Sequence, residues 1–157
     1  GDNFSASTEL QNMVNEWYKS GTECIFSCGG EMCDSVFEAA LANNGKSIGV
    51  DVDQSSVSDT VITSAMKGLS SGVQKILTSF YAGKWVLVGG LSSNLGVDDN
   101  AVGLPFATSK FEKFTESEYV KLVNSMKSGG TLEVKNDFSA FLAGGETFEN
   151  VAVSFVK

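Results

Sequence analysis

The sequence alternates between segments of helical periodicity and short apolar runs, and this alternation most limits what the chain can fold into. Apolar side chains recur every three or four residues over about 5–20, which predicts an amphipathic helix. Residues 24–28 then predict a strand, 31–43 a second helix and 47–53 a second strand. Repeating units of this kind pack as a mostly parallel sheet between helices. We therefore expect an α/β fold, a three-layer sandwich of Rossmann-like or flavodoxin-like type.

The rest of the chain predicts a longer helix followed by more irregular structure. Residues 62–81 carry apolar side chains at helical spacing, and residues 84–88 predict a third strand. Residues 89–103 are rich in glycine and partly acidic, which is too polar for a core. Thr115 and Glu118 have the spacing of a capping box, so a helix should begin there. Two alternating segments predict strands at 132–134 and 151–155.

The charge balance and the lack of histidine limit the chemistry that the chain can perform. It has 11 Lys and Arg against 19 Asp and Glu, a net charge of −8, and no His. It therefore cannot build a Ser-His-Asp relay or a His-ligated zinc or haem site. The negative charge disfavours nucleic acid as a partner. We expect no metal and no cofactor.

Three cysteines lie close together. Cys24, Cys28 and Cys33 have the spacing C-x3-C-x4-C, which matches neither the C-x2-C pairs of zinc ribbons nor the C-x-x-C redox motif. Cys24 and Cys28 stand at the two ends of an apolar run, so we expect a buried strand in which they act as small apolar side chains. The alternative is a disulfide, which suits an extracellular protein.

Two segments have the character of a ligand site, because ligands bind α/β sheets at the carboxyl ends of the strands. Gly29 and Gly30 lie between a predicted strand and a helix, where a ligand can reach backbone amides; a tight turn is the simpler interpretation. Asp51 and Asp53 alternate on one face of the next strand, followed by Gln54. The carboxylates suit an acid/base pair, a cation site or a grip on sugar hydroxyls, and a solvated strand end is the alternative.

Five motifs in this order give the sequence a family resemblance. They are FSCGG, VFEAA, IGVDVDQ, VITSAMK and VGLPF, which begin at residues 26, 36, 48, 61 and 102. Together they resemble the basic membrane protein family of substrate-binding lipoproteins, the purine-nucleoside-receptor branch of the type I periplasmic-binding-protein fold. The most specific part is IGVDVDQ followed by ITSAMK.

The resemblance covers almost the whole chain but only the second half of such a two-lobed protein. It implies that residues 1–60 are the α/β core of the second lobe. Residues 61–84 would be a hinge and a helix that packs on the missing first lobe, and residues 85–157 the return strand, C-terminal helix and tail. The apolar stripe of that helix should then be exposed in this chain alone, or covered by the first lobe or a second copy of the chain.

The resemblance also implies a function. The full-length protein would be an extracytoplasmic, lipid-anchored receptor that delivers purine nucleosides to an ABC importer, with the importer's permease as partner and no enzymatic activity. A sensory small-molecule-binding domain of the same fold and an enzyme of flavodoxin-like architecture are the alternatives, because the fold alone does not assign a function.

Individual residues receive roles from the same resemblance. Asp51 matches the carboxylate that grips ribose hydroxyls, and Lys67 matches a hinge-region lysine that contacts the ligand. Phe37 matches a position where an aromatic ring lies against the base, although residues 31–35 (EMCDS) replace the usual small-residue turn before it; the alternative is that Phe37 packs its helix onto the sheet. The remaining expected site residues are Gly29 and Gly30 beside the ligand and Asp53 and Gln54 at the cleft rim.

Overall fold

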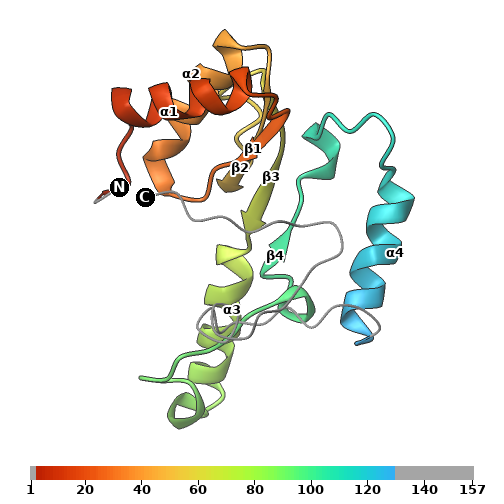
Figure 1. Cartoon of the computed structure of the whole chain (residues 1–157). Helices are drawn as coiled ribbons and strands as arrows, with labels where there is room; N and C mark the ends of the chain where they lie inside the picture. Colours follow the sequence, from red (N-terminus) through yellow and green to blue (C-terminus); the bar gives the residue numbers. More distant parts are fainter. Residues whose placement is uncertain (1–2, 130–157) are drawn as a thin grey trace, which may run out of the picture.

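The computed structural model describes residues 3–129, so the strands predicted at 132–134 and 151–155 lie outside the described residues. Four strands form one sheet in the order β1-β2-β3-β4 (Figure 1). The first three are parallel, and β4 runs antiparallel to β3. The α/β class and the mostly parallel sheet are therefore confirmed. The strands are β1 (Cys24–Phe26), β2 (Lys46–Asp51), β3 (Val61–Lys67) and β4 (Val102–Gly103).

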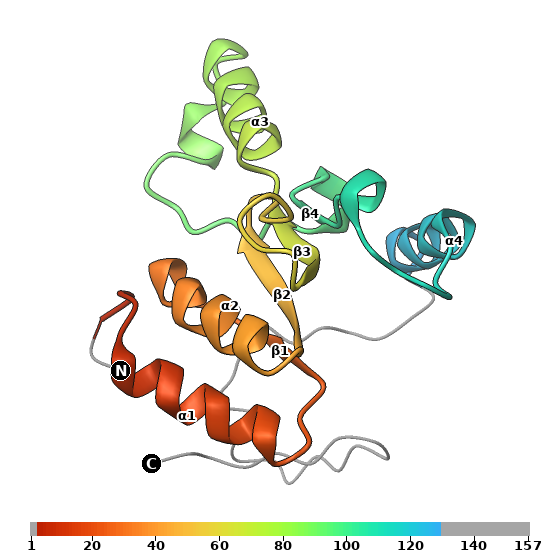
Figure 2. The same cartoon turned by 90° about the horizontal axis from the view of Figure 1, so that it is seen from above.

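Helices α1 (Thr8–Lys19) and α2 (Cys33–Ala42) lie together on one side of the sheet, with α2 next to the strands and α1 outside it (Figures 1 and 2). The Ser7 hydroxyl accepts a hydrogen bond from the Leu10 amide and caps α1. The main core lies between the two helices, as their apolar stripes predict. Its buried members are Val14, Tyr18, Val36, Ala39 and Ala40.

The prediction of a single helix over 62–81 is wrong, because this segment is a strand followed by a helix. Strand β3 pairs with β2, and α3 occupies only Leu69–Tyr81. The β-branched residues at the start of the segment favour an extended chain, and sheet pairing buries Val61 and Thr63. Gly68 lies between the two elements, and glycine is required there because a Cβ would lie 2.3 Å from the Asn100 carbonyl oxygen.

The strand predicted at 84–88 is also wrong. Trp85–Leu87 forms a short 3-10 helix, and the amides of Leu87 and Val88 donate to carbonyls three residues earlier. The apolar run is therefore held by local hydrogen bonds and does not pair with the sheet. Instead β4 lies inside the glycine-rich stretch 89–103, where Ala101 is buried.

Helix α4 (Glu116–Lys127) begins at the predicted capping box. The Thr115 hydroxyl accepts from the Glu118 amide at 3.3 Å, and the Glu118 carboxylate accepts from the Thr115 amide at 2.8 Å. Tyr119, in the first turn, joins an aromatic cluster that holds the helix to the preceding segment. The other rings are Phe106, Phe111 and Phe114.

The expectation that Cys24 and Cys28 are buried is wrong. All three cysteines are free, and only Cys33 is buried, with its thiol donating to the Ser27 carbonyl at 3.5 Å. Among residues 3–129, strand β1 pairs only with β2. Side chains along a strand alternate between its two faces, and in β1 the first and third are exposed while the middle one is partly buried. The half-exposed Phe26 lies on the same face of this strand as Cys24.

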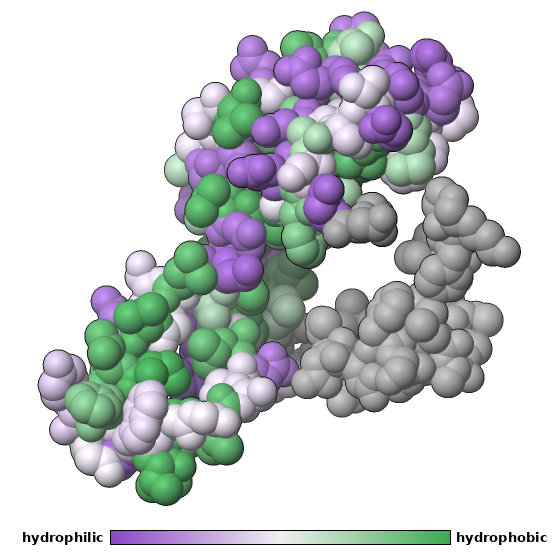
Figure 3. Space-filling model, turned by 90° about the vertical axis from the view of Figure 1, so that its left-hand side faces the viewer, coloured by the Kyte–Doolittle hydropathy of each residue, from purple (hydrophilic) through white to green (hydrophobic). Residues whose placement is uncertain are grey.

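Helix α3 leaves most of its apolar side chains exposed, while its expected packing on another lobe stays a prediction. No residue of α3 is buried, and Leu69, Val73 and Phe80 are each more than half exposed. Trp85–Leu87 continues this surface beyond the helix. Hydrophobic residues gather over the lower part of the molecule, which holds α3 (Figure 3). We use the name α3 face for the exposed apolar residues of this region, which are Leu69, Val73, Leu77, Phe80, Tyr81 and Trp85–Leu87.

Candidate functional site

Asp51 and Lys67 meet where two neighbouring parallel strands end. Asp51 is the last residue of β2 and Lys67 the last residue of β3, and the register pairs Asp51 with Met66. The Lys67 ammonium lies 2.8 Å from the Asp51 carboxylate. This hydrogen bond and the negative charge of Asp51 raise the pKa of Lys67, and Cys28 adds to the effect. Both side chains are about half exposed, so a ligand can reach them.

The backbone at Asp51 adopts a conformation that residues other than glycine rarely take. Its φ is +66°, and the Val52 amide donates to the Val50 carbonyl at 2.8 Å. A hydrogen bond across one residue of positive φ defines a classic γ-turn, which is rare and strained. Strain of this kind gathers at functional sites, where the surrounding structure must hold it in place.

Gln54 and Ser64 support this turn from inside. The Gln54 side-chain carbonyl accepts a hydrogen bond from the Val50 backbone amide at 2.8 Å, and the Ser64 hydroxyl accepts one from the Gln54 backbone amide at 3.0 Å. Gly49 lies opposite Ser64 in the sheet and leaves room for both groups. The sequence analysis missed Ser64, for which a serine inside an apolar strand was the available signal.

Asp53 is tied into the protein by hydrogen bonds to both of its carboxylate oxygens. One carboxylate oxygen accepts from the Ser55 amide at 3.0 Å, and the other accepts from the Thr108 hydroxyl at 2.6 Å. The bond from Thr108, followed by those from Ser55, lowers the pKa of Asp53. Asp53 therefore joins the β2–β3 connection to the segment after β4. The sequence analysis missed Thr108, because the two partners are far apart in the sequence.

Gly29 and Gly30 form the turn between β1 and α2. Gly30 has φ +61°, which favours glycine, and a Cβ at Gly29 would lie 1.8 Å from the Met32 sulfur. The Met32 amide donates to the Phe4 carbonyl at 2.8 Å, so the start of the described chain covers this turn. Cys28, just before this turn, makes the smallest contribution to the raised pKa of Lys67.

Phe37 is 3% exposed and packs against Cys33, Val61 and Val50 in a second core cluster. The structure therefore gives the ring packing partners inside the protein, while the roles expected for Phe37, Gly29, Gly30 and Gln54 at a ligand stay predictions.

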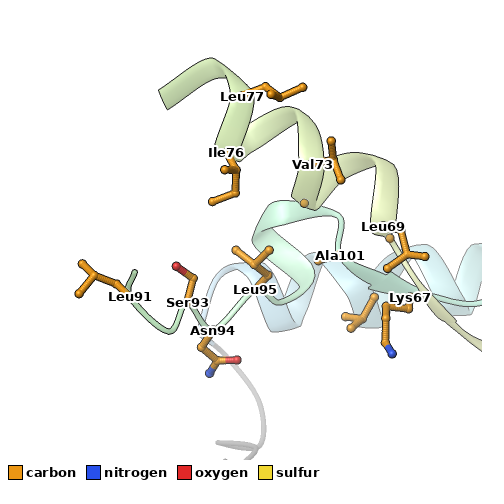
Figure 4. A pocket seen from close by; sticks show the side chains of 13 residues that line it. Lys67, Leu69, Val73, Ile76, Leu77, Leu91, Ser93, Asn94, Leu95 and Ala101 are labelled. Carbon is orange, nitrogen blue, oxygen red and sulfur yellow. The ribbon is translucent and has the colours of Figure 1, made fainter. Parts of the chain in front are cut away.

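An apolar cavity of about 730 Å³ adjoins the site. It lies between α3 and residues 91–102, and Lys67 stands at the end nearer the sheet (Figure 4). Leu69, Val73 and Ile76 line it from the helix, and Leu95 from the loop. The sequence analysis missed the loop residues, since it expected 89–103 to be a polar surface segment.

The site combines a carboxylate, an ammonium group and an adjoining apolar wall. This set of groups suits a polar ligand with hydroxyl groups and a flat apolar part, held by charge-assisted hydrogen bonds. Within residues 3–129, no three His, Cys, Asp or Glu side chains gather as they would around a metal ion. The described helices include none that is long and apolar enough to span a membrane.

Known proteins resemble this chain in sequence and in fold. The family model "ABC transporter substrate-binding protein PnrA-like" matches residues 1–136. Basic membrane protein D of Borreliella burgdorferi (strain JD1) is 31% identical over 124 residues, which are 76% of this chain and 36% of that protein.

Two crystal structures share the fold. A transcriptional activator of the comK gene from Bacillus halodurans has a TM-score of 0.58 and 18% identity, over 93% of this chain and 46% of that one. An ABC transporter solute-binding protein from Aeropyrum pernix K1 has a TM-score of 0.53 and 20% identity, over 83% and 40%. The chain thus spans less than half the length of these relatives.

Proposed function

Because the chain belongs to the family of PnrA-like ABC transporter substrate-binding proteins, we propose that it forms half of the ligand cleft of a nucleoside receptor. The observation that carries the proposal is the Asp51–Lys67 pair, which lies at the carboxyl ends of two neighbouring parallel strands. In α/β sheets this edge is where ligands bind. Both side chains are exposed enough to exchange their mutual contact for contacts with a ligand.

A neutral nucleoside suits these groups chemically. Ribose hydroxyls can donate to the Asp51 carboxylate and accept from the Lys67 ammonium, and such charge-assisted hydrogen bonds are stronger than neutral ones. Val102 lines the cavity that Lys67 borders and offers an apolar wall for a base. Binding of this kind needs no proton transfer, which agrees with a site that holds its ligand without transforming it.

The other lobe and the importer complete the proposed receptor. The chain spans less than half the length of its relatives, and the α3 face is exposed. In this proposal the α3 face packs on the lobe that has no counterpart here, and closure of the two lobes encloses the ligand. The full-length receptor would be lipid-anchored outside the cytoplasm and would pass nucleosides to an ABC permease.

The proposal can be tested by NMR on the ¹⁵N-labelled chain, titrated with adenosine and inosine. We expect the amides around Asp51 and Lys67 to shift, with a dissociation constant on the order of 1 mM because half of the cleft's contacts are missing. Ribose alone should shift the same amides more weakly. Unchanged spectra at about ten times that concentration would contradict the proposal.

A matched pair of variants shows whether the shifts report this site. Asp51→Asn removes the charge that would hold the ribose, while Asp99→Asn removes the equivalent charge from another ion pair, that of Asp99 with Lys75. The first variant should abolish the nucleoside shifts and the second should retain them. Equal responses from both variants would place the binding elsewhere.

A further inference from the structure

Asp51 must be held in its strained turn if its carboxylate is to face Lys67. Its φ of +66° lies in a region of backbone conformation that Asp tolerates but does not prefer. The carboxylate–ammonium contact of 2.8 Å joins two half-exposed side chains, and such contacts are too weak to impose backbone strain. The restraint therefore has to come from neighbouring groups.

Gln54 supplies the first restraint. Strand β1 pairs with β2 only as far as Ile48, so the Val50 amide lies beyond the end of that pairing. The Gln54 side-chain carbonyl accepts from this amide at 2.8 Å and takes the place of a neighbouring strand. Because Val50 also supplies the carbonyl that closes the γ-turn, this bond fixes the residue from which the turn starts.

Ser64 supplies the second restraint. Its side chain is fully buried in β3, and its hydroxyl accepts from the Gln54 amide at 3.0 Å. A buried hydroxyl in a sheet is a fixed point, since the strand pairing determines where it lies. Gly49 makes the arrangement possible, because a Cβ there would lie 2.6 Å from the Gln54 oxygen and 2.7 Å from the Ser64 oxygen.

We infer that Gln54 and Ser64 are positioning residues, which hold the γ-turn at Asp51 so that its carboxylate faces Lys67 and the ligand. Gln54 thus acts through Asp51, which differs from the rim contact that the family resemblance suggests for it. The ligand part of this inference rests on the proposed nucleoside-binding function, whereas the geometric part concerns the chain alone.

The geometric part can be measured without ligand, through the pKa of Lys67. Asp51 and Cys28 both raise the pKa of Lys67. Every protein in the experiment therefore carries Cys28→Ser, so that Asp51 is the group whose effect is measured. Lysine labelled with ¹³C at Cε reports each ammonium group by NMR over an alkaline titration. Asp51→Asn should lower the pKa of Lys67 towards its ordinary value, because the paired carboxylate is lost.

Gln54→Ala should reproduce most of that decrease although it removes no charge, because the released turn lets Asp51 leave Lys67. The double variant with Asp51→Asn should then lower the pKa no further than Asp51→Asn alone, which is the signature of an effect passed through Asp51. Asp99→Asn, which removes a carboxylate charge from another ion pair, is the control and should leave the pKa of Lys67 unchanged.

Two results would overturn the inference: an unchanged Lys67 pKa in Gln54→Ala, or decreases that add in the double variant. If Gln54→Ala does not fold, Ser64→Ala tests the same restraint from its other end, and an unchanged Lys67 pKa there also overturns it. Failure of the proposed function looks different, because nucleosides would then leave the wild-type spectrum unchanged while the Lys67 pKa still follows Gln54.

Discussion

The two halves of the described chain bury their apolar side chains very differently. Among residues 3–129, every buried residue except Ala101 lies between Val14 and Ser64. There α1, α2 and the first three strands form their own core. Beyond β3 the chain exposes Val73, Tyr81 and Val86, and its main assembly of rings is the cluster around Phe106.

The first half of the described chain has a core of its own. The first half satisfies the rule that helices and sheets bury an apolar face against each other. The α3 face keeps the pattern of an amphipathic helix while leaving its apolar side in water. Large exposed apolar surfaces are where proteins contact other proteins, membranes or ligands, so we expect the α3 face to be a contact surface.

The largest expected effect comes from making the same substitution in both halves. Phe37→Ala should lower the free energy of unfolding by about 3–5 kcal/mol, since it leaves a cavity in the second core cluster. Phe80→Ala should lower the free energy of unfolding by about 1 kcal/mol or less, because the ring is half exposed and forms T-shaped pairs with Tyr81 and Trp85, which are themselves exposed. Urea unfolding followed by circular dichroism measures both. Equal losses would remove the contrast between the halves.

The second prediction concerns the α3 face in solution. We expect the chain alone to self-associate weakly, with a dissociation constant on the order of 100 µM, because contact between two copies removes exposed apolar surface from water. Replacing Val73 and Leu77 with Lys should return the mass from light scattering to the monomer value of 16.6 kDa.

The matched control places the same two lysines on α4, at the exposed Val120 and Leu122. That variant should associate like the wild type, since its α3 face is intact. A wild-type protein that stays at 16.6 kDa at every concentration would refute self-association through the α3 face.

The third prediction tests how the first half is tied together at its outer helix. The buried Tyr18 hydroxyl donates to the Lys46 carbonyl at 2.6 Å and joins α1 to the start of β2. Tyr18→Phe should lower the free energy of unfolding by about 1 kcal/mol at pH 7, which is typical of a lost hydrogen bond. Tyr119→Phe removes a comparable bond, from the Leu104 amide, in the second half and serves as the control.

The pH dependence separates these two tyrosines. Burial is the main cause that raises the pKa of Tyr18 from 10.0 to about 12. The unfolded chain therefore loses this proton near pH 10 while the folded chain keeps it, and the contribution to stability is lost as the pH rises from 10 towards 12. Tyr18→Phe should show a shallower alkaline decline than the wild type. Tyr119→Phe should retain the wild-type slope, because it still contains Tyr18.

The sequence predicted the elements that depend on local pattern. Both α1 and α2 follow from apolar spacing, and the start of α4 follows from Thr115 and Glu118, whose contacts span three residues. Strand β3 was missed because Ala65 and Met66 fit a helical stripe as well as a strand, and only the pairing with β2 decides between them. The exposure of Cys24 on β1 is likewise a property of the sheet.

The same distinction holds at the candidate site. Asp51 and Lys67 were each singled out from the sequence, but their contact depends on the register of β2 against β3. The left-handed conformation of Asp51 and the bond from Gln54 to Val50 have no signature in residue types alone. Ser64 was predictable only in part, because a serine in an apolar strand signals a polar contact without naming the partner.

The last prediction has the smallest magnitude and concerns one of the hydrogen bonds that join the two halves. The Thr108 hydroxyl, after β4, donates to Asp53 in the β2–β3 connection and is the main reason that the pKa of Asp53 is lowered. A carboxylate of lowered pKa adds stability above its unfolded pKa, and that stability is lost as the pH falls through the folded pKa. Thr108→Val should therefore be slightly less stable than the wild type at pH 7, with the difference shrinking as Asp53 becomes protonated.

Thr78→Val, at an exposed position of α3, is the matched control and should show no such pH dependence. A Thr108→Val deficit that is constant from pH 7 to well below the ordinary aspartate range, about pH 3.9, would mean that Thr108 stabilises the protein by contacts other than its hydrogen bond to Asp53.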